Sequence, residues 1–236
     1  MTTAKPKIVA LLPMKANSER VRGKNFKPLN GQPLFRWILD SLLELSEIEQ
    51  VVINTDARAI LAEQGLVDTK RVLIRDRKPE ICGDFVSMNK VLADDISNVS
   101  ADVYLMTHTT NPLLRSTTIS NALNEFLDAV NKGTADSLFS VNRWQTRFYR
   151  QDGSAVNHDP NNLIRTQDLE PWFEENSNLY IFTTDSFAKT QARIGQQPIM
   201  FETPKLESID IDDQVDWTLA EALAQYVDDN PKNQVG

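Results

Sequence analysis

The chain has 236 residues, and 25 Lys and Arg against 33 Asp and Glu give it a formal net charge of −8. Hydrophobic residues make up 41% of the chain, which is typical of a globular protein with a buried core. The acidic excess argues against a general binder of nucleic acid or anionic membranes, because such proteins need a basic surface. The single cysteine, Cys82, excludes an internal disulfide, and with only two histidines a zinc site is not expected.

Length and hydropathy indicate one domain. A length of 236 residues fits a single domain over 1–236. The apolar run 8–12 is too short for the core of a signal peptide, and no stretch approaches the ~18 apolar residues of a membrane-spanning helix. We therefore expect a soluble, cytoplasmic protein with no membrane partner.

Short apolar runs typical of buried strands alternate with longer segments of helical periodicity. This alternation predicts parallel strands joined by crossover helices, and hence an α/β sheet between two helical layers. We predict strands at 7–12, 50–54, 71–74, 103–107 and 137–141, and helices at 34–45, 57–64, 87–96 and 116–131.

The alternation breaks at 142–176, where aromatic and basic residues precede a turn-rich stretch. That segment is too long for a simple connection, so we expect an inserted lid or dimerisation subdomain there. The alternation resumes with 179–183, 185–193 and 198–201. A final helix is expected over 214–227, and the tail at 228–236 is expected to fray.

A basic loop, residues 13–27, follows the first predicted strand. It contains five of the 25 basic residues and one acidic residue, Glu19. Open α/β sheets bind ligands at the carboxyl ends of their strands, and clustered cations there suit a polyphosphate. Neither a Walker loop nor a dinucleotide-binding fingerprint occurs in the sequence. On charge alone, a solvated surface loop is nearly as good an interpretation.

The segment LLPMKANSERVRGKNFKPLNGQPL (11–34) resembles the opening motif of the CMP-sugar synthetases, the acylneuraminate cytidylyltransferases and their relatives. In that family the loop wraps the triphosphate of CTP. Glu19 stands where the sialic-acid enzymes often carry a lysine, and the neighbouring Arg20 is a candidate replacement for that charge. The resemblance implies that Lys15, Ser18, Lys24 and Asn25 bind the nucleotide, and that Lys15, Arg20 and Lys24 act in catalysis.

Two stretches farther along continue the resemblance. NTDAR (54–58) resembles the family motif S-T-D-D, and for Asp56 we favour a helix-capping role over a catalytic one. RDRKPEICGDFVS (75–87) resembles the stretch R-P-x-x-L-x-x-D-x-x-S, with which the family reads cytosine. Among the basic residues at 75, 77 and 78 we choose Arg77 as the residue that faces the base, together with Ser87. Asp84 and Ser87 are equally plausible caps of the following helix.

Two more stretches resemble family segments that lie near the sugar substrate. THTTNPLLRS (107–116) resembles L-Q-P-T-S-P-L-R, which places His108 where the family glutamine contacts substrate, with no acid–base role implied. EENSNLYIF (174–182) matches a family segment near the sugar and the dimer contacts. The residues expected to bind the sugar acid are therefore His108, Arg147, Arg165, Gln167, Asn176 and Tyr180.

SIDIDDQVDWTLAE (208–221) resembles the family signature S-I-D-I-D-T-E-L-D. Its alternation predicts a short strand with Asp210 and Asp212 on one face, a pair of hard oxygen ligands suited to Mg²⁺. The alternative is a solvated acidic edge followed by a helix that Asp213 or Gln214 caps. The basic loop and the carboxylate pair together favour metal-assisted nucleotidyl transfer, with Asp212 also counted as catalytic.

The resemblance implies a three-layer α/β/α nucleotide-diphospho-sugar transferase fold and a homodimer. The implied reaction transfers CMP from CTP to the anomeric hydroxyl of an acidic 2-keto-3-deoxy sugar, with Mg²⁺ as cofactor and pyrophosphate as the other product. One alternative is a nucleotidyltransferase of the same fold that uses another nucleotide or a sugar phosphate, although the usual G-x-G-x-R loop is missing. Another is an inactive nucleotide-binding homologue, suggested because Lys15 and Glu19 replace the residues usual in the family.

Overall fold

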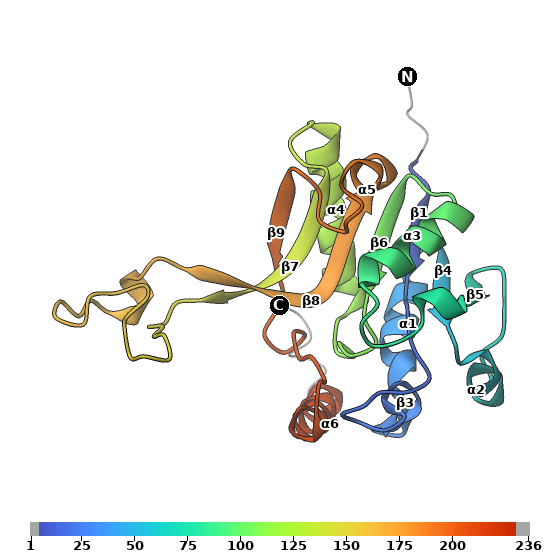
Figure 1. The fold of residues 1–236 in the computed structure, drawn as a ribbon, viewed down its shortest axis with the longest axis horizontal. Coiled ribbons are helices and arrows are strands. Elements are labelled where there is room, and N and C mark those ends of the chain that lie inside the picture. Colours follow the sequence, from blue (N-terminus) through green and yellow to red (C-terminus); the bar gives the residue numbers. More distant parts are fainter. Residues whose placement is uncertain (1–4, 230–236) are drawn as a thin grey trace.

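A computed structural model describes residues 5–229 of the chain. Its centre is a seven-stranded sheet with the strand order β5-β4-β1-β6-β8-β7-β9 (Figure 1). A small antiparallel ribbon of β2 (Pro28–Leu29) and β3 (Gln32–Pro33) lies apart from it. The strands of the main sheet are β1 (Ile8–Leu11), β4 (Ile48–Thr55), β5 (Val72–Asp76), β6 (Val103–Thr107), β7 (Ser137–Trp144), β8 (Trp172–Thr183) and β9 (Pro198–Glu202).

Strand direction differs from the prediction at one place. β1 runs parallel to β4 and β6, and β4 runs parallel to β5, as expected. β8, however, is antiparallel to both β6 and β7, so the prediction of parallel strands was wrong there. The reason is the connection: the chain returns from β7 through the 142–176 insertion as a long hairpin, and no crossover helix turns it round.

Helices cover both faces of the sheet, which confirms the three-layer α/β/α arrangement (Figure 1). On β1, Ala10 faces the core that α1 and α4 cover, whereas Val9 and Leu11 face the core on the side of α3 and α5. Burial on both sides explains why this strand is apolar throughout. The helices are α1 (Leu34–Glu44), α2 (Arg58–Glu63), α3 (Met88–Asn98), α4 (Ser116–Asn131), α5 (Thr184–Thr190) and α6 (Gln214–Asp229).

The sequence located the elements of the body closely, and α4 and β6 begin and end where predicted. Of the tail expected to fray, residues 228 and 229 belong to α6 and residues 230–236 lie outside the described range. No helix within residues 5–229 is both long enough and apolar enough to cross a membrane.

The 142–176 insertion is an arm that projects from the sheet (Figure 1). The ends of β7 and β8 pair as an antiparallel ribbon in which Trp144 lies opposite Trp172. The ribbon carries a loop, 145–171, in which Phe148 stacks on Trp172 with ring centroids 5.4 Å apart. Trp144, Trp172 and Phe173 keep 40–44% of their surface exposed, which leaves aromatic surface open on the arm.

The segment 208–212 is not the short strand that the alternation predicted. It runs as a loop from β9 towards α6, and Ile211 donates its N–H to the Thr110 carbonyl at 2.9 Å. The alternation arises instead from burial, because Ile211 packs with Trp217 in a third apolar cluster. The predicted cap is confirmed: Asp213 Oδ1 accepts the N–H groups of Val215 at 2.7 Å and Asp216 at 3.1 Å.

Candidate active site

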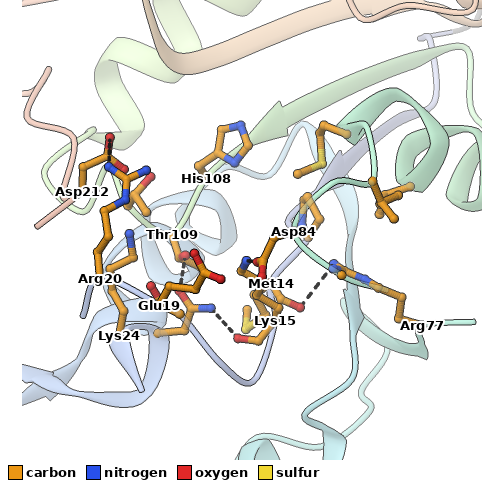
Figure 2. Close-up of a pocket in the computed structure, with 18 of the residues that line it drawn as sticks. Met14, Lys15, Glu19, Arg20, Lys24, Arg77, Asp84, His108, Thr109 and Asp212 are labelled. Atoms are coloured by element: carbon orange, nitrogen blue, oxygen red, sulfur yellow. Dashed lines mark hydrogen bonds and ion pairs between the residues drawn. The ribbon is translucent and has the colours of Figure 1, made fainter. Parts of the chain in front are cut away.

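One cleft of about 460 Å³ lies beyond the carboxyl ends of β1 and β6 (Figure 2). This is where open α/β sheets bind ligands. Its walls come from the basic loop, the segment after β5, the segment after β6, and the loop before α6. The predicted site residues that line it are Lys15, Ser18, Arg20, Lys24, Asn25, Arg77, His108 and Asp212.

Asn25 holds the basic loop in shape. Its Nδ2 donates to the Lys15 carbonyl at 2.7 Å, and its Oδ1 accepts from the Thr109 hydroxyl at 2.6 Å. Asp56 adds a tether, since its Oδ1 accepts the N–H of Ala16 at 2.6 Å. The prediction that Asp56 caps α2 was therefore wrong: Ala57 occupies the cap position of α2, and no side chain caps it there. These bonds orient the loop cations towards the cleft.

Two contacts join the basic loop to the loop before α6. The buried Lys24 donates from Nζ to the Ile211 carbonyl at 2.5 Å, and Arg20 pairs with Asp212 at 3.0 Å. Burial lowers the pKa of Lys24, and the negative charges of Asp212 and Asp210 oppose that shift. Figure 2 shows Arg20 and Lys24 on the same side of the cleft as Asp212. Cations and carboxylates therefore share one end of the cleft.

A second ion pair closes the other side of the loop. Lys15 Nζ bonds Asp84 Oδ1, and the Lys15 ammonium lowers the pKa of Asp84 (Figure 2). Glu19 lines the same part of the cleft. Lys15 and Arg20 are thus each already paired with a carboxylate, and a bound polyphosphate would have to replace Asp84 as the partner of Lys15.

The acid pair fits a hard cation. Asp210 is not among the residues that line the cleft, and its Oδ1 is buried without a hydrogen-bond partner. Burial raises the pKa of Asp210 and the charge of Asp212 adds to that shift, while a hydrogen bond with Thr110 opposes it. Asp212 is exposed at the cleft. Within residues 5–229 no three acidic, His or Cys side chains gather into a metal-binding cluster. A Mg²⁺ held here would therefore take its other oxygen ligands from phosphate and water.

Arg77 is the basic residue after β5 that reaches the cleft. Its Nε donates to Asn54 Oδ1 at 2.8 Å, and its Nη2 donates to the backbone oxygens of Asn54 at 2.8 Å and Met14 at 3.3 Å. Asn54 is turned this way because its Nδ2 donates to Asp95 Oδ1 at 2.8 Å. Burial lowers the pKa of Arg77. Its guanidinium is held in one orientation, and Nη1 makes no hydrogen bond to any other part of the described chain.

The neighbouring basic residues point elsewhere. Arg75 pairs with Asp94 at 2.9 Å and with Asp95, and Lys78 pairs with Asp94 at 2.6 Å, so both are bound to α3. Ser87 precedes α3 but its side chain makes no capping bond there, and it is not among the residues that line the cleft. The alternative in which Asp84 or Ser87 caps α3 was wrong. Asp84 is paired with Lys15, and Ser87 stands at the cap position without a side-chain hydrogen bond.

His108 stands in the cleft wall at the end of β6 (Figure 2). Burial lowers its pKa to about 3, and the charges of Arg193 and Lys24 act in the same direction. The ring is therefore neutral near pH 7, in keeping with a contact role and no acid–base role. Arg193, which sequence reasoning missed, lies 3.5 Å from His108 Nε2 through its Nη1. No local pattern marks Arg193, because its neighbours come from distant strands.

The remaining sugar-side residues do not line the cleft. Asn176 is buried, and its amide bonds Ser140 at 2.6 Å and Thr203 at 2.6 Å. The Tyr180 ring is buried, and its hydroxyl donates to Glu175. The other three lie on the arm: Arg147 donates to the Ile164 carbonyl at 2.6 Å, Arg165 pairs with Asp168 at 2.7 Å, and the carbonyl of Gln167 accepts from Gln145 at 3.2 Å.

The sheet and its cleft define a three-layer α/β/α fold with a ligand cleft at the carboxyl ends of its strands. Solved structures with similar folds include a CMP:2-keto-3-deoxy-manno-octonic acid synthetase complexed with CTP, at a TM-score of 0.65 and 14% identity over 93% of this chain and 99% of that one. A 4-diphosphocytidyl-2C-methyl-D-erythritol synthase gives a TM-score of 0.66 at 11% identity, over 93% of this chain and 100% of that one. More narrowly, the chain belongs to the cytidylyltransferase family, whose sequence profile matches residues 9–229.

Curated relatives of the chain are named for acylneuraminate, legionaminic acid or pseudaminic acid. N-acylneuraminate cytidylyltransferase of Oncorhynchus mykiss is 29% identical over 91% of this chain and 49% of its own length. CMP-N,N'-diacetyllegionaminic acid synthase of Legionella pneumophila is 26% identical over 93% and 97%. Pseudaminic acid cytidylyltransferase of Campylobacter jejuni is 22% identical over 92% and 96%. The chain thus spans about half of the fish enzyme and nearly all of the Legionella and Campylobacter enzymes.

Proposed function

We propose that this protein transfers CMP from CTP to the anomeric hydroxyl of a 2-keto-3-deoxy sugar acid and releases pyrophosphate. The observation that carries the proposal is the junction of the basic loop with the acid pair, through Lys24–Ile211 and Arg20–Asp212. Triphosphate-binding cations and metal-binding carboxylates are needed together for nucleotidyl transfer, and this cleft supplies both. Membership of the cytidylyltransferase family supports CTP as the nucleotide.

The chemical step is an in-line displacement at the α-phosphorus of CTP. The hydroxyl oxygen at C2 of the sugar forms the new bond to phosphorus, the bond to the β-phosphate oxygen breaks, and the hydroxyl proton leaves. Such a transfer depends on positioning and on neutralising charge on the phosphoryl oxygens. Lys15, Arg20 and Lys24 supply that neutralisation and steady the departing pyrophosphate.

Mg²⁺ is the proposed cofactor, and Asp210 and Asp212 are the residues that would hold it. A bound divalent ion there screens phosphate charge and makes the sugar hydroxyl more acidic. The buried, unpartnered oxygen of Asp210 supports this assignment, because a carboxylate oxygen in that state favours a cation neighbour.

Arg77 is the proposed reader of cytosine. Its fixed guanidinium and its unbonded Nη1 at the cleft wall support the choice, since a rigid donor distinguishes one base edge from another better than a mobile one. Ser18 and Asn25 complete the nucleotide side, with Asn25 acting through the shape of the loop. Ser87 stays a prediction from the family motif.

We also propose a homodimer in which the arm of one protomer reaches the cleft of its partner. Arg147, Arg165 and Gln167 lie on the arm and not at the cleft of their own chain, so a substrate role for them requires a second copy. The exposed aromatic surface on the arm supports an interface there. We place the enzyme in the cytoplasm, where CTP is available.

The test is pyrophosphate release from CTP and Mg²⁺ with a panel of N-acetylneuraminate, N,N'-diacetyllegionaminate, pseudaminate and 2-keto-3-deoxy-manno-octonate. Release with one member confirms the activity and names the sugar. Thermal shifts with CTP, UTP, ATP and GTP form the control, and CTP alone is expected to stabilise the protein strongly. CTP binding without release on any sugar would favour the inactive homologue, and stabilisation by another nucleotide would favour a different nucleotidyltransferase.

A further inference from the structure

Arg193 lies just after α5, and three groups fix its guanidinium. Its Nη2 pairs with Glu175 Oε1 at 3.3 Å, and its Cζ lies over the Tyr180 ring, 3.8 Å from the centroid. Its Nη1 faces His108 Nε2 at 3.5 Å. Glu175 is itself held, because it accepts the Tyr180 hydroxyl. Stacking and pairing therefore hold the planar guanidinium against His108 in the cleft wall.

Nη1 of Arg193 has only a weak hydrogen-bond partner within the described residues, His108. A distance of 3.5 Å is longer than the usual 2.7–3.2 Å of a hydrogen bond, and His108 is neutral, so this contact is weak. The Arg193 side chain keeps 22% of its surface exposed. An acceptor that enters from the cleft beside His108 would therefore make a stronger bond to Nη1 than the protein makes now.

The backbone on both sides of this cluster is strained. Within the described range three non-glycine residues have a positive φ, and two of them flank the cluster: Ser177 at 59° and Gln191 at 54°. Each lies two residues from a charged member, Glu175 or Arg193. Gln191 adopts this conformation as the residue that ends α5, so the course of the backbone that leads to Arg193 is set by the helix end.

We propose that Arg193 binds the carboxylate of the acidic sugar, with His108 beside it as an uncharged hydrogen-bonding partner. This inference rests on the proposed function and names the specificity residue of the same site. Two anionic substrates need separate cations. The basic loop serves the triphosphate of one. Arg193 is not itself among the residues that line the cleft, but it contacts His108, which is, and it is therefore placed to receive the other from the His108 side. A guanidinium N–H bonds a carboxylate more strongly than an uncharged carboxamide, because donor and acceptor are then both charged.

The test compares wild type with Arg193→Gln and Arg193→Lys, using the sugar acid that wild type turns over fastest in the panel above and its C1 carboxamide. Arg193→Gln is expected to raise KM for the acid by roughly 10- to 100-fold, as expected for loss of a bond between charged groups, and to leave KM for CTP unchanged. It is also expected to remove the preference for acid over carboxamide. Arg193→Lys should restore part of that preference.

The matched control is Arg58→Gln. Arg58 also pairs with carboxylates, Asp68 and Asp76 at 2.8 Å each, but it lies by β5 at the opposite edge of the sheet, so neither KM should change. Equal rises in KM for the sugar and for CTP, or an intact preference for the acid in Arg193→Gln, would overturn the inference while the proposed function stood. A wild-type protein that turned over no sugar acid would overturn both.

Discussion

Arg20 and Asp212 form an ion pair of 3.0 Å that joins the loop after β1 to the loop before α6. Both side chains are more than half exposed, at 65% and 54%. An exposed pair contributes only about 0–1 kcal/mol to folding, so stability does not explain this arrangement. Its significance lies in what it brings together, the cation that we propose binds the triphosphate and the carboxylate that we propose binds the metal.

The first prediction follows from that pair. Asp212→Asn is expected to reduce turnover by at least roughly 100-fold, because it removes a charged ligand of the metal from the reaction centre. The melting temperature should stay within about 2 °C of wild type, since only an exposed pair is lost. Steady-state pyrophosphate release and thermal unfolding measure the two effects.

Asp128→Asn is the control for Asp212→Asn, because Asp128 is an exposed aspartate on α4 and is not among the cleft residues. It should leave turnover and melting temperature unchanged. Near-normal activity in Asp212→Asn would remove Asp212 from the metal site.

The second prediction concerns Asp210 and pH. Burial and the charge of Asp212 raise the pKa of Asp210, so as pH falls it takes up a proton earlier than an ordinary aspartate does. Protons and Mg²⁺ compete for the same oxygen. The Mg²⁺ concentration for half-maximal rate should therefore rise as pH falls towards the acid side. A Mg²⁺ titration at several pH values measures it, and a requirement independent of pH would contradict the assignment.

How far the sequence alone can lead is clear from particular residues. The bounds of α4 and β6 were predictable because periodicity and the flanking turns are local signals. The direction of β8 was not, since it depends on how a long insertion returns to the sheet. The sequence pointed to Asp210 and Asp212 because apolar and acidic residues alternate there. The structure has no strand at this position, and the alternation arises because Ile211 packs into an apolar cluster.

The charged residues around the cleft show the limit more sharply. The sequence pointed to Arg77 among the three basic residues at the end of β5, but the reason for excluding Arg75 is visible only in the folded chain, where α3 presents Asp94 and Asp95 to Arg75. Arg193 had no local signal at all, because its partners Glu175 and His108 come from β8 and from the end of β6. Chemistry that depends on neighbours from several elements appears only once the chain is folded.

The third prediction separates Arg75 from Arg77. Arg75→Met is expected to destabilise the fold by about 3–5 kcal/mol, because it leaves the buried Asp95 without its charged partner, whereas Asp94 keeps Lys78. Burial raises the pKa of Asp95 to about 6, which shows how little water compensates that charge. Thermal and urea unfolding measure the loss.

Arg77→Met should act differently, because the partners it leaves are neutral oxygens of Asn54 and Met14. We expect its Kd for CTP to rise by about 10-fold or more, with weaker discrimination against UTP, as a donor to the base is lost. Isothermal titration with both nucleotides checks this. A CTP affinity equal to that of wild type would mean that another group reads the base.

The last prediction concerns the arm. Replacing residues 146–170 by an Asn-Gly turn keeps the ribbon in which Trp144 faces Trp172 and removes the distal loop with Arg147 and Arg165. No residue that lines the cleft is deleted, so the thermal shift with CTP should persist. The deletion also removes the exposed apolar side chains of Tyr149, Leu163 and Ile164, so we expect a monomer by analytical ultracentrifugation and loss of turnover with the sugar acid.

Point variants distinguish two causes of that loss of turnover, the loss of the dimer and the loss of the cations on the arm. Arg147→Ala and Arg165→Ala remove arm cations without removing the exposed aromatic surface of the arm, so both should stay dimeric. If the arm serves the partner's cleft, mixing either variant with a cleft variant such as Asp212→Asn should restore activity in the heterodimers, because one composite site then has both of its halves intact. A monomeric wild type, or full activity in the deletion, would show that each cleft works without a second copy.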